Sequence, residues 1–233
     1  LLMFVAAAVC GGIWAFIPAI FKAKMGTNET IFTLMMNYVA IKFVTYLQYG
    51  PWMDPAANGF PRIATFSDNA VLPSIGGIAI VLTAFVYFLI NYTKTGYEIA
   101  VVGESLDTAR YAGMNISKVI VIAMLISGGL CGVVGMIQAS AIEKTLVAGI
   151  ANNYGFTAII TAWLAKLNPA STLVVCVVFA MLIQGGEYIQ IALGVPSAVS
   201  DVVQGLILFF VLGSEFFMRY KIHFGKPSEK EVA

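Results

Sequence analysis

Apolar residues lie along the chain in long, nearly uninterrupted runs. A helix that rises about 1.5 Å per residue needs about 20 residues to cross a hydrocarbon core of about 30 Å. Several runs approach or exceed that length and predict membrane-spanning helices: Leu1–Phe21, Ile31–Leu47, Ala70–Tyr92, Val119–Ala141 and Val195–Ser214. Two apolar runs are shorter, Tyr154–Leu167 and Ser171–Ile183, and the second ends at Gly185-Gly186. We therefore expect an all-α polytopic membrane protein with six or seven helices, some of them short or broken.

The first run is not typical of a signal peptide, because its basic residues, Lys22 and Lys24, follow the apolar stretch instead of preceding it. The chain begins at a leucine inside this run. We therefore expect further helices upstream of Leu1. Residues 1–218 are predicted to form one transmembrane domain, and residues 219–233 a polar cytoplasmic tail.

The composition excludes the soluble classes of protein. Hydrophobic residues make up 60% of the chain and charged residues 11%, against about 45–50% and about 25% in soluble domains. A net charge of +1 provides no basic patch for nucleic acid. The three cysteines are isolated in apolar runs and His223 is the only histidine, so neither a metal site nor a Ser–His–Asp triad is indicated.

The basic residues predict the orientation in the membrane. If the polar loop Thr93–Lys118 is cytoplasmic, alternation of the helices places ten of the thirteen Lys and Arg residues inside. Only Arg62 and Lys144 then lie outside, and Lys42 lies within a helix. Positively charged loops stay on the cytoplasmic side, so this orientation is preferred over its inverse. The preferred orientation requires the segment Tyr154–Leu167 to cross the membrane once.

The cytoplasmic loop contains the signals of a short, well-bounded helix over Leu106–Ala112. Ser105 is a good N-cap, Asp107 lies in the first turn where the helix dipole favours an anion, and Gly113 suits the C′ position. The small residues Ala109, Ala112 and Gly113 permit close approach of another surface. From the residues alone, two interpretations are open: a rigid knob that fits a partner's groove, or an amphipathic interfacial helix.

Glycines and prolines predict close packing in one place and irregular backbone in others. Gly128 and Gly132 share one helix face, which favours close helix packing over a hinge. Gly185-Gly186 and Gly194-Val-Pro196 are expected to break the later helices, so that the last third of the chain forms the wall of a translocation cavity. The proline-rich outer loop Tyr49–Asn69 is either an interfacial connector or a docking surface for an external protein.

Polar residues within the apolar runs are the candidates for a solute path. A small, weakly polar stripe lies on one helical face and comprises Thr33, Asn37, Ala40 and Val44. Lys42 is rotated away from Asn37 and is expected to extend toward the interface or to pair elsewhere. The remaining candidates are Asn153, at the start of a short helix, and Gln184 and Glu187, near the predicted break. The alternative role for each is a hydrogen bond between helices. As a set they suit a wide path for a neutral, polar solute, and they are too sparse for a proton relay.

Three segments resemble one known family. Residues 96–115, G-Y-E-I-A-V-V-G-E-S-L-D-T-A-R-Y-A-G-M-N, are similar to the cytoplasmic loop of bacterial ABC importer permeases, roughly G-x-x-x-x-A-x-G-x-N-x-x-A-A-x-x-x-G-I. Residues 21–40, F-K-A-K-M-G-T-N-E-T-I-F-T-L-M-M-N-Y-V-A, and 156–169, F-T-A-I-I-T-A-W-L-A-K-L-N-P, resemble segments of nucleoside permeases that work with basic membrane lipoproteins. The resemblance covers about Leu1 to Phe217 and indicates the superfamily of branched-chain amino acid and simple-sugar permeases.

The resemblance implies an all-α permease of the vitamin-B12-importer type (type II) in the bacterial cell membrane. Its implied partners are a second permease subunit, ABC ATPase subunits, and an extracytoplasmic substrate-binding lipoprotein that delivers a nucleoside. It also implies that the short helix is a coupling helix seated on the ATPase, formed by Gly103, Glu104, Ser105, Leu106, Ala109, Arg110, Ala112 and Gly113. The chain contains no G-x-x-x-x-G-K-[ST] motif, so we expect the partner, and not this subunit, to bind ATP and Mg²⁺ and to hydrolyse ATP. No cofactor is expected in this chain.

Other functions fit the sequence less well. The nearest alternative is the same machinery for a simple sugar. An ion-coupled secondary transporter needs an intramembrane acid–base relay, for which only Glu187 and Asp201 are available. An intramembrane enzyme lacks support, because the chain has no HExxH motif and no histidine within an apolar run.

Overall fold

The computed structural model describes residues 2–55, 61–67, 71–72, 76–151 and 154–194, and isolated positions between 196 and 214. The chain divides into two compact units, Leu1–Tyr154 and Gly155–Ala233, which are described separately below. The predicted run Val195–Ser214 is described only in part, and the tail 219–233, together with Asp201, lies outside the described residues.

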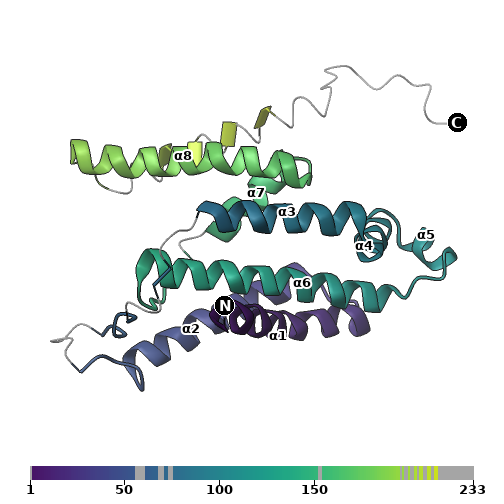
Figure 1. The fold of residues 1–233 in the computed structure, drawn as a ribbon, viewed down its shortest axis with the longest axis horizontal. Helices are drawn as coiled ribbons and strands as arrows, with labels where there is room; N and C mark the ends of the chain where they lie inside the picture. The colour runs from purple at the N-terminus through teal and green to yellow at the C-terminus, as the bar shows by residue number, and fades with distance from the viewer. Residues whose placement is uncertain are drawn as a thin grey trace, which may run out of the picture. The chain divides into compact units, whose positions relative to one another are not determined.

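The first unit is built from helices (Figure 1). These are α1 (Leu2–Met25), α2 (Glu29–Tyr49), α3 (Gly76–Tyr92), α4 (Lys94–Glu104), α5 (Leu106–Tyr111) and α6 (Ile116–Ile137), with the π-helical turn η2 (Gln138–Glu143) continuing α6. The second unit contains α7 (Tyr154–Leu164, starting at the unit boundary) and α8 (Pro169–Leu193).

The predicted all-α, membrane-spanning fold is confirmed. Four of the described helices are long and apolar enough to cross a membrane: α1, α2, α6 with η2, and α8. The bent pair α3–α4 makes a fifth candidate. In the part of the chain with assigned structure, the only β-type pairing is an isolated antiparallel bridge between Met53 and Ile63. The chain is therefore a multi-pass membrane protein.

The expected break of a later helix at Gly185-Gly186 was wrong. Gly185-Gly186 does not break α8, which continues to Leu193 and ends at Gly194, whose φ is 62°. In a bilayer, each backbone group without a partner costs several kcal/mol, which exceeds the roughly 1 kcal/mol helix penalty of a glycine. Helix α7 stops at Leu164, because Lys166 and Leu167 adopt left-handed φ values of 53° and 57°. Its 11 residues span about 16 Å, about half a hydrocarbon core.

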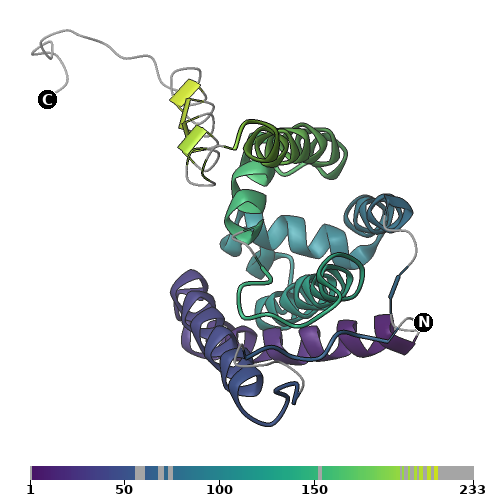
Figure 2. The same ribbon diagram turned by 90° about the vertical axis from the view of Figure 1, so that its left-hand side faces the viewer.

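Helices α1 and α6 form the tightest contact in the first unit (Figure 2), and glycine makes it possible. A Cβ added to Gly132 would lie 2.2 Å from the carbonyl oxygen of Ala7, and one added to Gly128 would lie 2.2 Å from the Cβ of Ala15. The facing residue Gly11 is equally confined, since its added Cβ would lie 2.4 Å from the Gly128 oxygen. The predicted role of the Gly128-xxx-Gly132 pair in close packing is confirmed.

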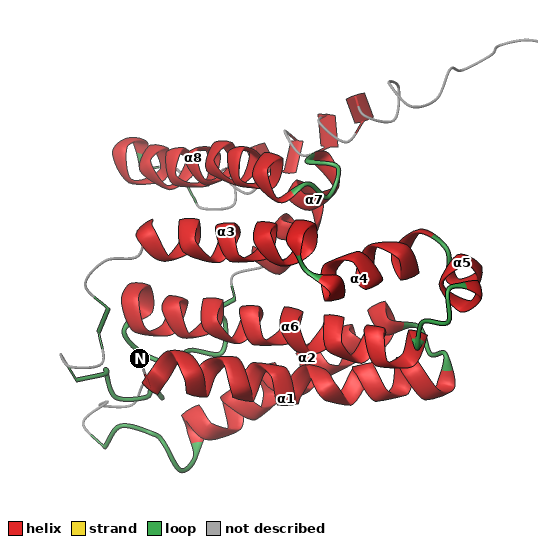
Figure 3. Ribbon diagram, turned by 45° about the vertical axis from the view of Figure 1, so that its right-hand side comes forward, coloured by secondary structure: helices red, strands yellow, loops and turns green. Residues whose placement is uncertain are grey.

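The loops of the first unit gather at its two ends (Figure 3). At one end, the Ser117 hydroxyl at the start of α6 donates to the Ala23 carbonyl near the end of α1 over 3.2 Å. This contact places Lys22 and Lys24 at the same end as the segment 93–118. At the other end, the Phe66 N–H donates to the Lys144 carbonyl over 2.8 Å, and the Thr145 hydroxyl donates to the Ile63 carbonyl over 2.9 Å. The basic residues of the first unit therefore segregate as the orientation argument requires.

Candidate functional site: the capped helix α5 and the polar side of α2

Helix α5 is positioned by a sharp bend between α3 and α4, whose axes differ by 75°. The Thr93 hydroxyl serves both helices, because it donates to the Leu89 carbonyl over 2.6 Å and accepts from the Gly96 N–H over 3.1 Å. Gly96 is buried in this corner, and an added Cβ would lie 2.2 Å from the Leu89 carbonyl oxygen. Helix α4 within the loop Thr93–Lys118 was not expected from the sequence.

Ser105 joins α4 to α5 and caps both helices. Its backbone is extended, its N–H donates to the Val101 carbonyl over 3.0 Å, and its hydroxyl accepts from the Thr108 N–H over 3.3 Å. Asp107 lies in the first turn. The predicted N-cap is therefore confirmed, and the chain changes direction between two helices within one residue.

A Schellman motif closes α5 at its other end. The Gly113 N–H donates to the Arg110 carbonyl and the Met114 N–H to the Ala109 carbonyl, both over 3.0 Å. Gly113 has φ 72°, the left-handed conformation that favours glycine at the C′ position, as predicted. Asn115 then caps α6 by accepting from the Lys118 N–H over 3.1 Å. Helix α5 thus has a fixed start and a fixed end.

The outer face of α5 carries an ion pair flanked by two large side chains. Tyr111 is 94% exposed and Leu106 50% exposed. Between them the Arg110 guanidinium lies 3.5 Å from the Asp107 carboxylate, and these two residues line a shallow, open depression with Tyr111. Gly103, Glu104, Ala112 and Gly113 are also exposed, and Ser105 is half-buried.

Ala109 is the exception among the predicted coupling residues. Its small side chain was expected on the surface that approaches a partner, but it is fully buried. Helix α5 packs against α4 and α6, and Ala109 is buried between the exposed residues Thr108 and Arg110. Tyr111 was not among the predicted coupling residues, although an aromatic residue two positions before Gly113 was the available signal.

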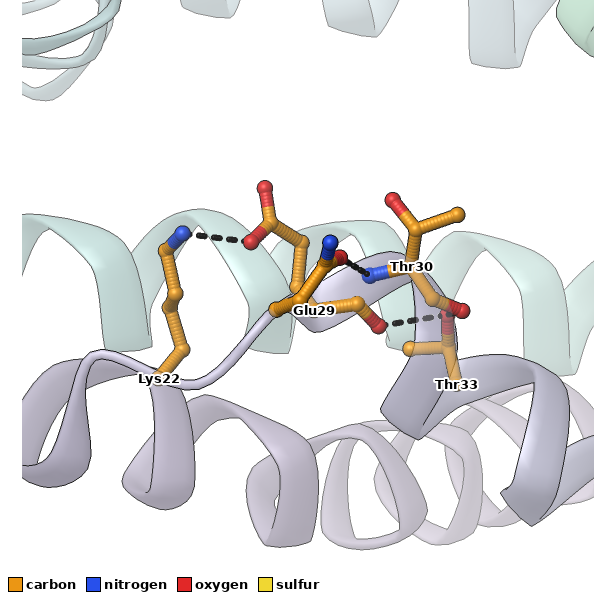
Figure 4. Close-up of polar contacts among 5 residues, drawn as sticks. Lys22, Glu29, Thr30 and Thr33 are labelled. Atoms are coloured by element: carbon orange, nitrogen blue, oxygen red, sulfur yellow. Dashed lines mark hydrogen bonds and ion pairs between the residues drawn. The ribbon is translucent and has the colours of Figure 1, made fainter.

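The predicted path residues of the first unit lie on α2. Figure 4 shows how the helix begins: Lys22 forms an ion pair with Glu29, and the Asn28 side-chain oxygen accepts from the Thr30 N–H over 3.0 Å. The Thr33 hydroxyl donates to the Glu29 carbonyl over 2.8 Å, so its hydrogen is used in a bond within the helix. Asn37 is exposed one turn further on and shares that face, whereas Ala40 and Val44, predicted on the same face, are half-buried.

The predicted path residues of the second unit lie on α8, where both are exposed. The Gln184 amide donates to the Glu187 carboxylate over 3.2 Å, so one turn of the helix joins them. Asn153 lies outside the described residues. Among the residues that are described, no group of three His, Cys, Asp or Glu side chains is placed to hold a metal ion.

Comparison with known proteins agrees with this arrangement. Residues 1–212 match the family described as the permease component of branched-chain amino acid transport systems. The chain is 33% identical to a glucose ABC transporter permease of Haloferax volcanii, over 95% of this chain and 63% of the relative. It is 31% identical to a guanosine ABC transporter permease of Bacillus subtilis, over 98% of this chain and 68% of the relative. No solved structure matches the chain.

A further relative is a nucleoside ABC transporter permease of Lactococcus lactis, which is 30% identical over 87% of this chain and 60% of its own length. The chain therefore spans about 60–68% of the length of these three relatives. The fold and the match over residues 1–212 define a polytopic ABC-type permease. The chain belongs to the branched-chain amino acid and sugar permease family, as the resemblance of its three segments indicated.

Proposed function

We propose that this chain is the permease subunit of an ATP-driven importer that forms the translocation path for nucleosides. Residues 1–218 would form the membrane domain, and the segment 93–118 would face an ABC ATPase in the cytoplasm. The observation that carries the proposal is helix α5, which is capped by Ser105 and Gly113 and presents Leu106 and Tyr111 outward. A projection whose backbone is fixed at both ends can dock on a partner with little change of shape.

The proposed orientation places α5 and the C-terminal end of α1 inside the cell and the segment around Arg62 outside. The segregation of basic residues supports it. Single cysteines at Asp107 and Thr65, in a cysteine-free chain in intact cells, test it with a membrane-impermeant maleimide. We expect labelling at position 65 alone, and labelling at position 107 alone would invert the topology.

The proposed assembly contains a second permease subunit, ABC ATPase subunits that bind ATP and Mg²⁺, and an extracytoplasmic lipoprotein that binds the solute. The chain itself is not proposed to be an enzyme, and no cofactor of its own is proposed. Support comes from the named functions of the relatives, which are permeases of ABC transporters.

The proposed substrate class, nucleosides, draws on the guanosine and nucleoside permeases among the relatives. A simple sugar is the second candidate, favoured by the 33% identity to the glucose permease. The experiment that separates them is ATP-dependent uptake of labelled guanosine into proteoliposomes of the full-length complex, with unlabelled uridine or glucose as competitor. Competition by uridine alone supports nucleosides. Competition by glucose, or uptake that follows an ion gradient without ATP, contradicts the proposal.

Contact between α5 and the ATPase has its own test. Large aromatic residues dominate binding at interfaces, and their truncation costs about 2 kcal/mol or more when they are central. We expect Tyr111→Ala to weaken co-purification of the ATPase by about tenfold or more. Trp52→Ala, an exposed aromatic residue from the opposite end of the first unit, is the matched control and should leave co-purification unchanged. Normal co-purification and ATP-dependent uptake in Tyr111→Ala would make α5 an interfacial anchor only.

A further inference from the structure

Helix α2 has two unlike sides. Its half-buried residues include Phe32, Met36, Ala40 and Val44, at four-residue steps, and all four are apolar. With about 100° of rotation per residue, Lys42, Tyr38 and Tyr46 fall on the opposite side, together with apolar residues, whereas Thr33 falls within the half-buried arc and Asn37 at its edge. In the part of the chain that the structure describes, nothing buries that side, since α2 contains no buried residue at all.

Lys42 lies in the middle of this uncovered side. Tyr38 and Tyr46 stand one turn before and one turn after it, each 66% exposed, and Lys42 is exposed as well. Among the described residues, Lys42 has no hydrogen bond and no ion pair, in contrast to Lys22, which is paired with Glu29. The helix therefore carries an unneutralised positive charge within a segment long enough to span the membrane.

The position of Lys42 argues against an extension of its side chain to the nearer interface. Its Cα lies seven residues, about 10 Å along the axis, before the end of α2 at Tyr49. Side chains in a helix lean toward the N-terminus, which for α2 is the end farther from Lys42. Its natural direction is therefore into the membrane, where charged groups face water-filled cavities and solute pathways.

A helix partner does not suit this side either. Helix contacts in membranes use small residues that allow close approach, as Gly128 and Gly132 do between α1 and α6. The uncovered side of α2 instead presents two tyrosines and an ammonium group. Water and a polar solute can solvate all three.

We propose that Lys42, between Tyr38 and Tyr46, lines the aqueous solute path and sets a positive potential there that disfavours cationic solutes. This inference rests on the proposed permease function and deepens it, because fixed charges along a path select by the sign of the solute's charge. It assigns the path to solutes that are neutral or anionic. Tyr38 and Tyr46 offer flat faces and hydroxyl groups to such a solute.

The test measures water access and local potential without relying on transport. The cysteine-free, full-length permease, assembled with its partner subunits, receives Tyr38→Cys or Met36→Cys and reacts with anionic and cationic methanethiosulfonates. We expect Tyr38→Cys to react at least tenfold faster than Met36→Cys, which lies on the packed side. Side chains at positions 38 and 42 are about 5–6 Å apart, so Lys42→Gln should lower the ratio of anionic to cationic rates about three- to tenfold.

Two further variants keep the result interpretable. Lys42→Arg should preserve the rate ratio, and Lys24→Gln, an exposed cation at the end of α1, should not change it. Equal reaction of Tyr38→Cys and Met36→Cys, or a ratio that Lys42→Gln leaves unchanged, would overturn the inference. Because this readout needs no transported solute, failure of guanosine uptake would contradict the nucleoside assignment and leave the inference about Lys42 standing.

Discussion

The α1–α6 pair and helix α2 belong to the same unit but differ in how closely they are packed. Helices α1 and α6 approach so closely that glycine is required at Gly11, Gly128 and Gly132. Helix α2 contains no buried residue and turns Tyr38, Lys42 and Tyr46 away from its packed side. The comparison separates a contact that holds the unit together from a surface that is left open. An open polar surface on a membrane-length helix needs water or solute against it, because lipid cannot satisfy its polar groups.

The largest expected effect comes from filling the α1–α6 contact. Gly132→Val places a branched side chain where even a Cβ would lie 2.2 Å from a backbone oxygen. Backbone cannot move aside as a flexible side chain can, so we expect a loss of about 1–3 kcal/mol or more of stability. Thermal denaturation followed by fluorescence-detected size-exclusion chromatography measures it.

Gly135→Val is the matched control, since nothing lies within 4 Å of a Cβ added there. Equal stability of the Gly132 and Gly135 variants would show that the α1–α6 contact is not close, and the comparison with α2 would lose its basis.

A smaller effect is expected where α2 begins. Asn28 is its N-cap, and its side chain accepts from the Thr30 N–H over 3.0 Å. Removal of such a cap costs about 0.5–2 kcal/mol. Asn28→Ala should therefore shift the melting temperature less than Gly132→Val does, and Asn28→Asp should restore it. A larger shift for Asn28→Ala would mean that α2, and not the α1–α6 pair, dominates the stability of the unit.

Local signals in the sequence were sufficient to predict the ends of α5. Ser105 and Gly113 act through backbone groups only a few residues away, so their roles follow from residue type and spacing. The spans α1, α2 and α6 also follow from run length alone. The sequence predicted that Gly128 and Gly132 approach another helix closely. It did not predict that this helix is α1.

Features that depend on tertiary contacts escaped prediction. Helix α4 starts where Gly96 packs against the end of α3. Thr93 suits an N-cap by residue type, but the apolar pattern of α4 is too short to predict a helix after it. The burial of Ala109 depends on which side of α5 meets α4 and α6. Helix α8 continues through Gly185-Gly186 because hydrogen bonding in an apolar medium outweighs glycine's weak helix propensity.

The most direct test of the central claim, that the open side of α2 forms the wall of a solute path, compares two adjacent residues. Asn37 is exposed at the edge of the open side, and Met36 is half-buried on the packed side. In ATP-dependent guanosine uptake by the full-length complex, Asn37→Ala should lower the rate about tenfold, because a hydrogen bond to the solute worth about 1–2 kcal/mol is lost. Met36→Ala should keep the uptake rate per assembled complex near that of the unaltered protein. Unchanged uptake in Asn37→Ala, together with reduced stability of the purified complex, would contradict the claim and make Asn37 a structural residue.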